Sequence, residues 1–144
     1  MPPSLPPPKP PLPFPMTNCL FVDRLKVLGV LCLTRADVKA YRDRFGLRGL
    51  CDAHHVIPRS CRMHPTVVAL GYDVEGAGNF ALLPSERGGE QLLLRDRAIH
   101  SGGHMEYNRY VWSSLDSVPD EDSLCRLVHL LHRRVRHDPN VPWN

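Results

Sequence analysis

Residues 53–58 read Ala-His-His-Val-Ile-Pro, and residues 79–84 read Asn-Phe-Ala-Leu-Leu-Pro. Both runs contain short stretches of apolar residues. Both end at a proline, which cannot donate a hydrogen bond to a neighbouring strand. We therefore predict two short strands, over residues 50–57 and 80–83.

Helical patterns lie between these strands and on both sides of them. The predicted helices cover residues 18–30, 34–45, 64–70, 104–115 and 122–135. The second helix has the clearest start, because Thr34 followed three residues later by Asp37 resembles a capping box. Residues 71–79 contain three glycines and should form a loop. The predicted fold is α+β, with two N-terminal helices, a two-stranded antiparallel sheet and a C-terminal helix packed around it.

The N-terminal segment differs in composition from the rest of the chain. Nine of the first 15 residues are proline, so this segment lacks backbone donors and favours an extended conformation. We interpret residues 1–16 as a proline-rich tail or linker. A length of 144 residues suits one domain. Residues 17–144 are therefore predicted to form a single domain, with its motif core over residues 50–115.

The overall composition is that of a globular chain. Hydrophobic residues make up 42% and charged residues 23%, and the most apolar stretch is interrupted by Asp23, Arg24 and Lys26. No segment reaches the roughly 18 to 20 apolar residues of a membrane helix, so we expect no membrane partner. Five cysteines are an odd number without a dense framework, which argues against a disulfide-stapled secreted fold. The net charge of +3 permits a nucleic-acid partner without requiring one.

The histidines are grouped. Five of the eight lie between positions 54 and 104, and four of these form the groups His54-His55 and His100-x3-His104. Histidines four residues apart at a helix start can converge on one metal ion. Adjacent residues of a strand face opposite sides, so His54 and His55 should not share an ion unless the strand is distorted. One of the two would bind metal and the other would have a different role.

Phosphodiester hydrolysis has a use for both roles. A metal ion held by three imidazoles keeps open positions for a phosphate oxygen, and a separate imidazole can take a proton from the attacking water. Such a base needs one bare nitrogen, so its other nitrogen should donate to a fixed acceptor. An asparagine carbonyl is suited to this, and Asn79 stands at the start of the second strand.

Four runs of the chain carry a family resemblance. They are Ala53-His54-His55-Val56-Ile57-Pro58, Leu70-Gly71-Tyr72-Asp73, Asn79-Phe80-Ala81-Leu82-Leu83-Pro84 and the run from His100-Ser101-Gly102-Gly103-His104 to Asn108. In order, spacing and flanking residues, they resemble the AHH branch of the HNH/endonuclease VII nuclease superfamily. The resemblance covers about residues 51–115.

This resemblance implies a ββα-metal (His-Me finger) centre with flanking N- and C-terminal helices, and an endonuclease that uses one divalent cation. It makes His54, His100 and His104 the metal ligands, His55 the general base and Asn79 the residue that orients the base. Mg²⁺ is the expected ion, with Zn²⁺, Mn²⁺ and Ni²⁺ as alternatives.

The same resemblance implies partners and a setting. The expected substrate is DNA rather than RNA. Such domains often occur as modules of secreted bacterial toxins, each inhibited by an immunity protein. The chain is therefore interpreted as a toxin-type module that acts in the cytoplasm, with secretion and an immunity partner following only if it is a toxin.

Two further predictions concern residues near the presumed site. Arg59 and Arg97 could bind substrate phosphates through their planar guanidinium groups. A rival interpretation takes Cys51-x2-His54 and Cys61-x2-His64 as a structural zinc site, in a non-catalytic module that binds nucleic acid or protein. This alternative leaves His55, Asn79, His100 and His104 unexplained, so we favour the nuclease.

Overall fold

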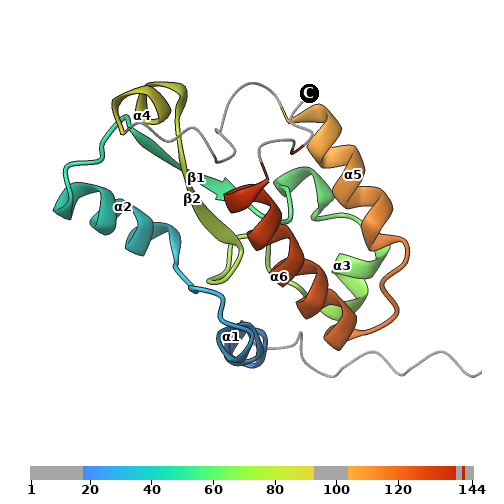
Figure 1. Ribbon diagram of the computed structural model, residues 1–144. Coiled ribbons are helices and arrows are strands. Elements are labelled where there is room, and N and C mark those ends of the chain that lie inside the picture. Colours follow the sequence, from blue (N-terminus) through green and yellow to red (C-terminus); the bar gives the residue numbers. More distant parts are fainter. Residues whose placement is uncertain (1–17, 93–103, 139–140, 142–144) are drawn as a thin grey trace, which may run out of the picture.

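Two paired strands lie near the centre of the molecule, with helices around them (Figure 1). The computed structural model describes residues 18–92, 104–138 and 141. Strands β1 (Cys51–His55) and β2 (Phe80–Pro84) pair antiparallel, with His55 opposite Phe80 and Cys51 opposite Pro84. The predicted two-stranded sheet is therefore confirmed.

The helices surround this sheet. They are α1 (Asn18–Val27), α2 (Arg35–Arg44), the 3₁₀ turn η1 (Arg59–Cys61), α3 (Pro65–Leu70), α4 (Glu86–Gln91), α5 (Met105–Leu115) and α6 (Glu121–His137). In Figure 1, α2 and α4 lie on one side of the strands, α3 and α5 on the other, and α6 crosses in front. This arrangement confirms the α+β fold class. Within the described ranges, none of the helices combines the length and the apolar character needed to cross a membrane.

The start of α2 is fixed by a capping box. The Thr34 hydroxyl accepts from the Asp37 backbone N–H at 3.1 Å, and the Asp37 carboxylate accepts from the Thr34 N–H at 2.9 Å. These two bonds satisfy donors that a helix start would otherwise leave without partners. They also set the position of Arg35, the first residue of α2, whose side chain reaches the sheet.

Helix α4 was not predicted, because its sequence contains the pair Gly88-Gly89, which disfavours a helix. Packing explains the first of these glycines. A Cβ atom on Gly88 would lie 1.7 Å from the backbone oxygen of Leu50, the residue before β1. Ser85 caps the start of the helix, because its hydroxyl accepts from the Gly88 N–H at 3.1 Å. Tertiary contact and capping therefore outweigh the low helix propensity of glycine.

The main core lies between one face of the sheet and the helices. The core residue Ala81 of β2 pairs directly with His54, so these two side chains share one face of the sheet. Helix α6 buries one stripe, formed by Leu124, Val128, Leu131 and Val135. Helix α5 does the same with Tyr107, Val111 and Leu115. His54 is therefore on the core-facing side of β1, whereas His55 is on the other side.

A buried histidine links α6 to the loop before β2. His132 is 4% exposed, and its Nε2 donates to the backbone oxygen of Gly78 at 2.6 Å. Burial lowers the pKa of His132 from 6.5 to about 4. Unfolding returns the ring to water, where it binds a proton more readily.

The stability of the protein should therefore depend on pH through His132. Between pH 6.5 and pH 4 the unfolded chain binds more protons at this ring than the folded protein, so the free energy of unfolding should fall as the pH falls. Urea unfolding at pH 7 and pH 5 measures this effect. His132→Gln, which can still donate to the same oxygen, should lose less stability between the two pH values. Equal losses in parent and variant would contradict the prediction.

Candidate active site

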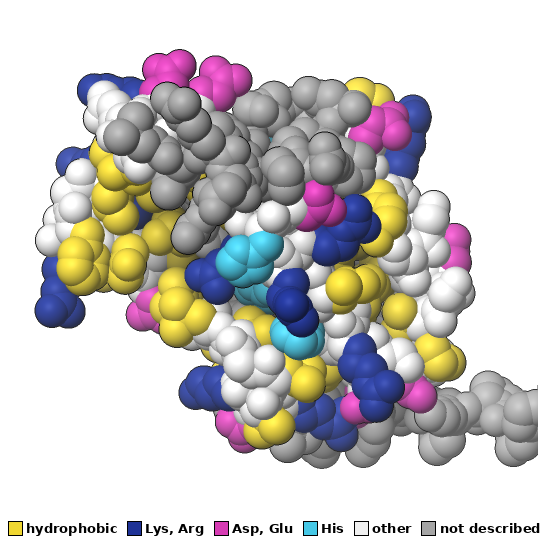
Figure 2. Space-filling model, viewed as in Figure 1, with side chains coloured by type: hydrophobic (Ala, Val, Ile, Leu, Met, Phe, Trp, Pro, Cys, Tyr) yellow, Lys and Arg dark blue, Asp and Glu magenta, His cyan; other side chains and the backbone are white. Residues whose placement is uncertain are grey.

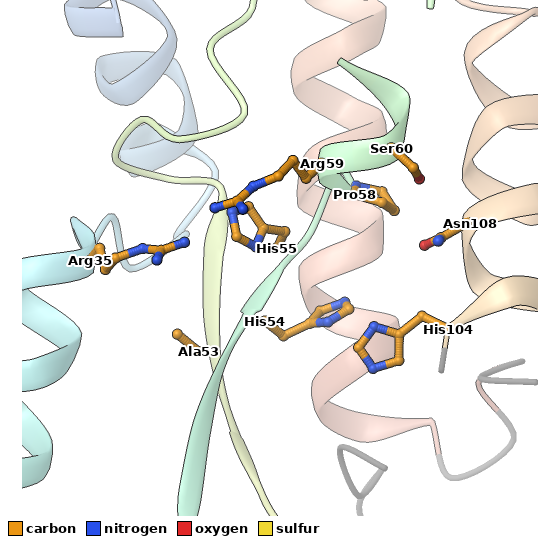
Figure 3. Close-up of a pocket in the computed structure, with 9 residues that line it drawn as sticks. All are labelled: Arg35, Ala53, His54, His55, Pro58, Arg59, Ser60, His104 and Asn108. Carbon is orange, nitrogen blue, oxygen red and sulfur yellow. The ribbon is translucent and has the colours of Figure 1, made fainter. Parts of the chain in front are cut away.

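A cleft of about 400 Å³ opens where β1, η1, α2 and α5 approach one another. Nine residues line it: Arg35, Ala53, His54, His55, Pro58, Arg59, Ser60, His104 and Asn108 (Figure 3). The structure therefore brings together three of the predicted histidines and Arg59. His100 and Arg97 lie outside the described residues.

His54 and His104 point toward each other from two different elements (Figure 3). His54 is 2% exposed, and its ring centroid lies 5.3 Å from that of His104, with the ring planes at 79°. His104 is the residue that precedes the first turn of α5. The Tyr107 hydroxyl donates to the Val56 carbonyl at 2.6 Å, which ties α5 to the end of β1. Two imidazoles thus converge where the sequence predicts a metal ion.

The second histidine of the doublet faces the other way. The His55 ring lies against Phe80, with the centroids 4.8 Å apart, and its Nε2 lies 3.1 Å from Oε1 of Glu75. The His55 side chain is 19% exposed, so it is more accessible than His54. The two histidines therefore have separate environments, as the alternation of a strand requires.

Glu75 connects His55 to two arginines of the cleft. Its Oε1 also accepts from Nε of Arg59 at 2.8 Å, and its Oε2 accepts from Arg35 at 3.3 Å. The bond from Arg59, followed by the contact with His55, holds the pKa of the Glu75 carboxyl below its usual value. Sequence reasoning missed both Glu75 and Arg35. The only signal was the capping box, which places Arg35 at a helix start.

Asn79 does not make the predicted hydrogen bond to His55. It is completely buried, and its Oδ1 accepts from the Ile57 backbone N–H and from the Tyr72 hydroxyl, both at 2.8 Å. Its Nδ2 donates to the carbonyls of Ile57 at 2.9 Å and of Val74 at 2.7 Å. The oxygen and the nitrogen of the Asn79 amide are thus both hydrogen-bonded, to the backbone and to Tyr72. Asn79 ties the end of β1 to the loop that carries Glu75, and any influence on His55 is indirect.

The donor atoms of the cleft are suited to a divalent cation. Imidazole nitrogens bind divalent transition metals well, and the Asn108 amide on the same wall adds an oxygen donor (Figure 3). Within residues 18–92, 104–138 and 141, no set of three or more His, Cys, Asp or Glu side chains is placed to hold an ion. The described residues therefore include two of the three predicted metal ligands, His54 and His104, and the third, His100, lies beyond them.

The rival zinc site is not assembled. It requires Cys51, His54, Cys61 and His64, all of which are described. Cys51 and His54 are three residues apart on β1 and so face opposite sides. His64 is instead buried next to Asp116, with 2.8 Å between its Nε2 and Oδ1 of the carboxylate. The prediction of a structural zinc site, as the alternative to a nuclease, is therefore wrong.

A second group of histidine and arginine side chains lies on α6. Figure 2 shows such side chains gathered near the middle of one face of the molecule, where α6 crosses the sheet in Figure 1. His129, Arg133, Arg136 and His137 line a surface pocket there. In Figure 3, α6 lies behind the side chains of the cleft. None of these four residues lines the cleft that contains His54, His55 and His104.

Comparison with models of protein families matches residues 39–134 to AHH, a nuclease family of the HNH/endonuclease VII superfamily with a conserved Ala-His-His. Comparisons with the curated proteins and with the solved structures found no match. The family match covers both strands, every residue that lines the cleft except Arg35, and most of α6, and Ala53-His54-His55 supplies the conserved triplet. The chain belongs to the AHH family of nucleases.

Proposed function

We propose that this nuclease is an endonuclease that hydrolyses phosphodiester bonds of DNA with the help of one divalent cation. The observation that carries the proposal is the arrangement of three histidines around one cleft. His54 and His104 converge on one side, and His55 is held by a carboxylate on the other. This separation matches the division between metal ligands and a general base.

The proposed ligands of the cation are His54 and His104, together with His100 outside the described residues. A bound divalent cation would screen the charge of the phosphate and stabilise the leaving 3′ oxygen. Mg²⁺ is the ion we propose. Mn²⁺, Ni²⁺ and Zn²⁺ should be compared with it, because imidazole nitrogens favour transition metals.

The proposed base is His55. The Glu75 carboxylate can only accept a hydrogen bond, so Nε2 of His55 must carry the hydrogen. In the neutral ring this leaves Nδ1 bare. Nδ1 would take a proton from a water molecule while the water oxygen forms a bond to phosphorus and the bond from phosphorus to the 3′ oxygen breaks. The products would be a 5′-phosphate and a 3′-hydroxyl end.

Arg35 and Arg59 are the proposed contacts to the substrate backbone. Their side chains are 61% and 56% exposed, and both line the cleft. A guanidinium group can grip a phosphate with two parallel hydrogen bonds. Both arginines now pair with Glu75, so a phosphate would share or replace that partner. The α6 group does not line the cleft and is not part of this proposal.

A metal-binding experiment tests the ligand assignment. His104→Ala should weaken Mn²⁺ binding, measured by calorimetry, by about ten- to a hundredfold, because one of the converging imidazoles is lost. His137→Ala, which removes an exposed histidine of α6, should leave the affinity unchanged. Plasmid cleavage should require added Mg²⁺ or Mn²⁺ and stop in EDTA. Unchanged Mn²⁺ affinity in His104→Ala, or cleavage in EDTA, would overturn the metal-dependent proposal.

We also propose a biological setting, which rests on family membership. The chain would act as a toxin-type module on DNA in the cytoplasm of the target cell and would be inhibited by an immunity protein. Its expression in the bacterial cytoplasm should then arrest growth, whereas expression of His55→Ala should not. Normal growth with active enzyme would count against the toxin role.

A further inference from the structure

Glu75 has no role in the predictions from the sequence, yet its carboxylate meets three side chains of the cleft. It lies in the loop between α3 and β2. Its Oε1 contacts Nε2 of His55 at 3.1 Å and Nε of Arg59 at 2.8 Å, and its Oε2 contacts Arg35 at 3.3 Å. It is the only acidic side chain with a hydrogen bond or ion pair to His55 within the described ranges.

The chemistry of this contact is directional. An ionised carboxylate offers acceptors only, so it selects the form of His55 in which Nε2 carries the hydrogen. The two arginines add positive charge beside Glu75 and favour its ionised form. A bond from Nε2 to a fixed acceptor also limits rotation of the ring. Both effects prepare Nδ1 to accept a proton.

The acceptor itself is held in place by its surroundings. The backbone N–H of Glu75 donates to the Asp73 carboxylate at 2.9 Å. Four residues later in the same loop, the Asn79 side chain bonds to the backbone of Ile57. Arg35 approaches from the capped start of α2. The carboxylate is therefore restrained from the loop side and from the helix side.

We infer that Glu75 is the positioning residue of the general base: its carboxylate holds the His55 ring, which is the role that sequence reasoning assigned to Asn79. The inference rests on the proposed function, because it takes His55 to be the base. It assigns Glu75 no direct contact with the substrate or with the metal ion.

A double-mutant cycle tests whether Glu75 acts through His55. Cleavage of a fluorescent DNA duplex should be measured under single-turnover conditions for the parent, Glu75→Ala, His55→Ala and the double variant. Glu75→Ala should lower the maximal rate about ten- to a hundredfold in the parent. In the His55→Ala background the same change should cost less than about twofold, because the residue through which Glu75 acts is already absent.

Two further measurements separate positioning from a structural or substrate-binding role. Glu75→Gln keeps an acceptor oxygen at the same reach and should cleave at least about three times faster than Glu75→Ala. The DNA concentration at half-maximal rate should change less than about threefold in both variants. Asp122→Ala, which removes the partner of Arg126 on α6, is the matched control and should cleave like the parent.

The outcomes are distinct. Equal losses from Glu75→Ala in both backgrounds, no loss in the parent, or a glutamine variant no better than alanine would each overturn the role of Glu75. Full activity of His55→Ala would instead overturn the proposed base, whatever the behaviour of Glu75. If Glu75→Ala lowers the melting temperature and its loss of rate is explained by the fraction of protein that is unfolded, the role of Glu75 is structural and the positioning role is wrong.

Discussion

Replacement of His55 by alanine is expected to lower the rate of DNA cleavage about a thousandfold, the middle of the range for removal of a general base. The ring is the imidazole of the cleft that faces away from the proposed metal ligands, and its Nε2 is engaged by Glu75. Alanine at this position removes the proposed proton acceptor. The measurement is single-turnover cleavage of a DNA duplex with Mg²⁺.

The control for this variant is metal binding. His55 lies on the opposite face of β1 from His54, so its removal should leave the Mn²⁺ affinity within about twofold of the parent. His104→Ala should show the opposite pattern: its Mn²⁺ affinity should fall, and its cleavage rate should fall as a consequence. If His55→Ala cleaves as fast as the parent, the assignment of the base is wrong. If it loses metal as well as activity, the proposed separation of roles fails.

Replacement of Asn79 by alanine should lower the free energy of unfolding by about 4 kcal/mol, because several buried groups lose their partners at once. The Asn79 side chain makes four hydrogen bonds, two of them to the N–H and the C=O of Ile57. Alanine would leave these groups buried without a bond. Urea unfolding at pH 7, followed by circular dichroism, gives the difference.

Tyr72→Phe provides the matched control. It removes only the hydroxyl that donates to Oδ1 of Asn79, so the expected loss is about 1 kcal/mol. The loss in Asn79→Ala should clearly exceed it. A difference of less than about 1 kcal/mol between the two variants would mean that Asn79 is not the structural tie described above.

Local sequence patterns predicted the frame of the site. The alternation of a strand separated His54 from His55, and the capping box of Thr34 and Asp37 placed the start of α2. These features depend on neighbours within a few residues, so they can be recognised in one sequence. The two strands were predicted from such patterns, whereas the pairing of His54 with His104 at one metal ion was implied by the family resemblance.

Contacts between distant segments were not predictable in this way. Glu75 and His55 are 20 residues apart, and Arg35 and Glu75 are 40 apart. Nothing near Glu75 in sequence distinguishes it from a solvated loop carboxylate. The amide of Asn79 had several potential partners, and only the folded loop shows that the backbone of Ile57 and Val74 takes them. Helix α4 likewise depends on the backbone of Leu50, which lies far from Gly88 in sequence.

The hydrogen bonds between Asn79 and Ile57 also help to keep His54 and His55 on their respective faces of the sheet. A two-stranded sheet is held by few hydrogen bonds, and a slip of one residue would turn every side chain of β1 to the other face. A slip in one direction would put His55 in the place of His54, and a slip in the other direction would put His54 in the place of His55. Asn79 immediately precedes β2 and bonds to both backbone groups of Ile57, so it favours the observed alignment of the strands over a slipped one. This buried amide thereby helps to keep the two imidazoles on opposite faces of β1, which the proposed division into metal ligand and base requires.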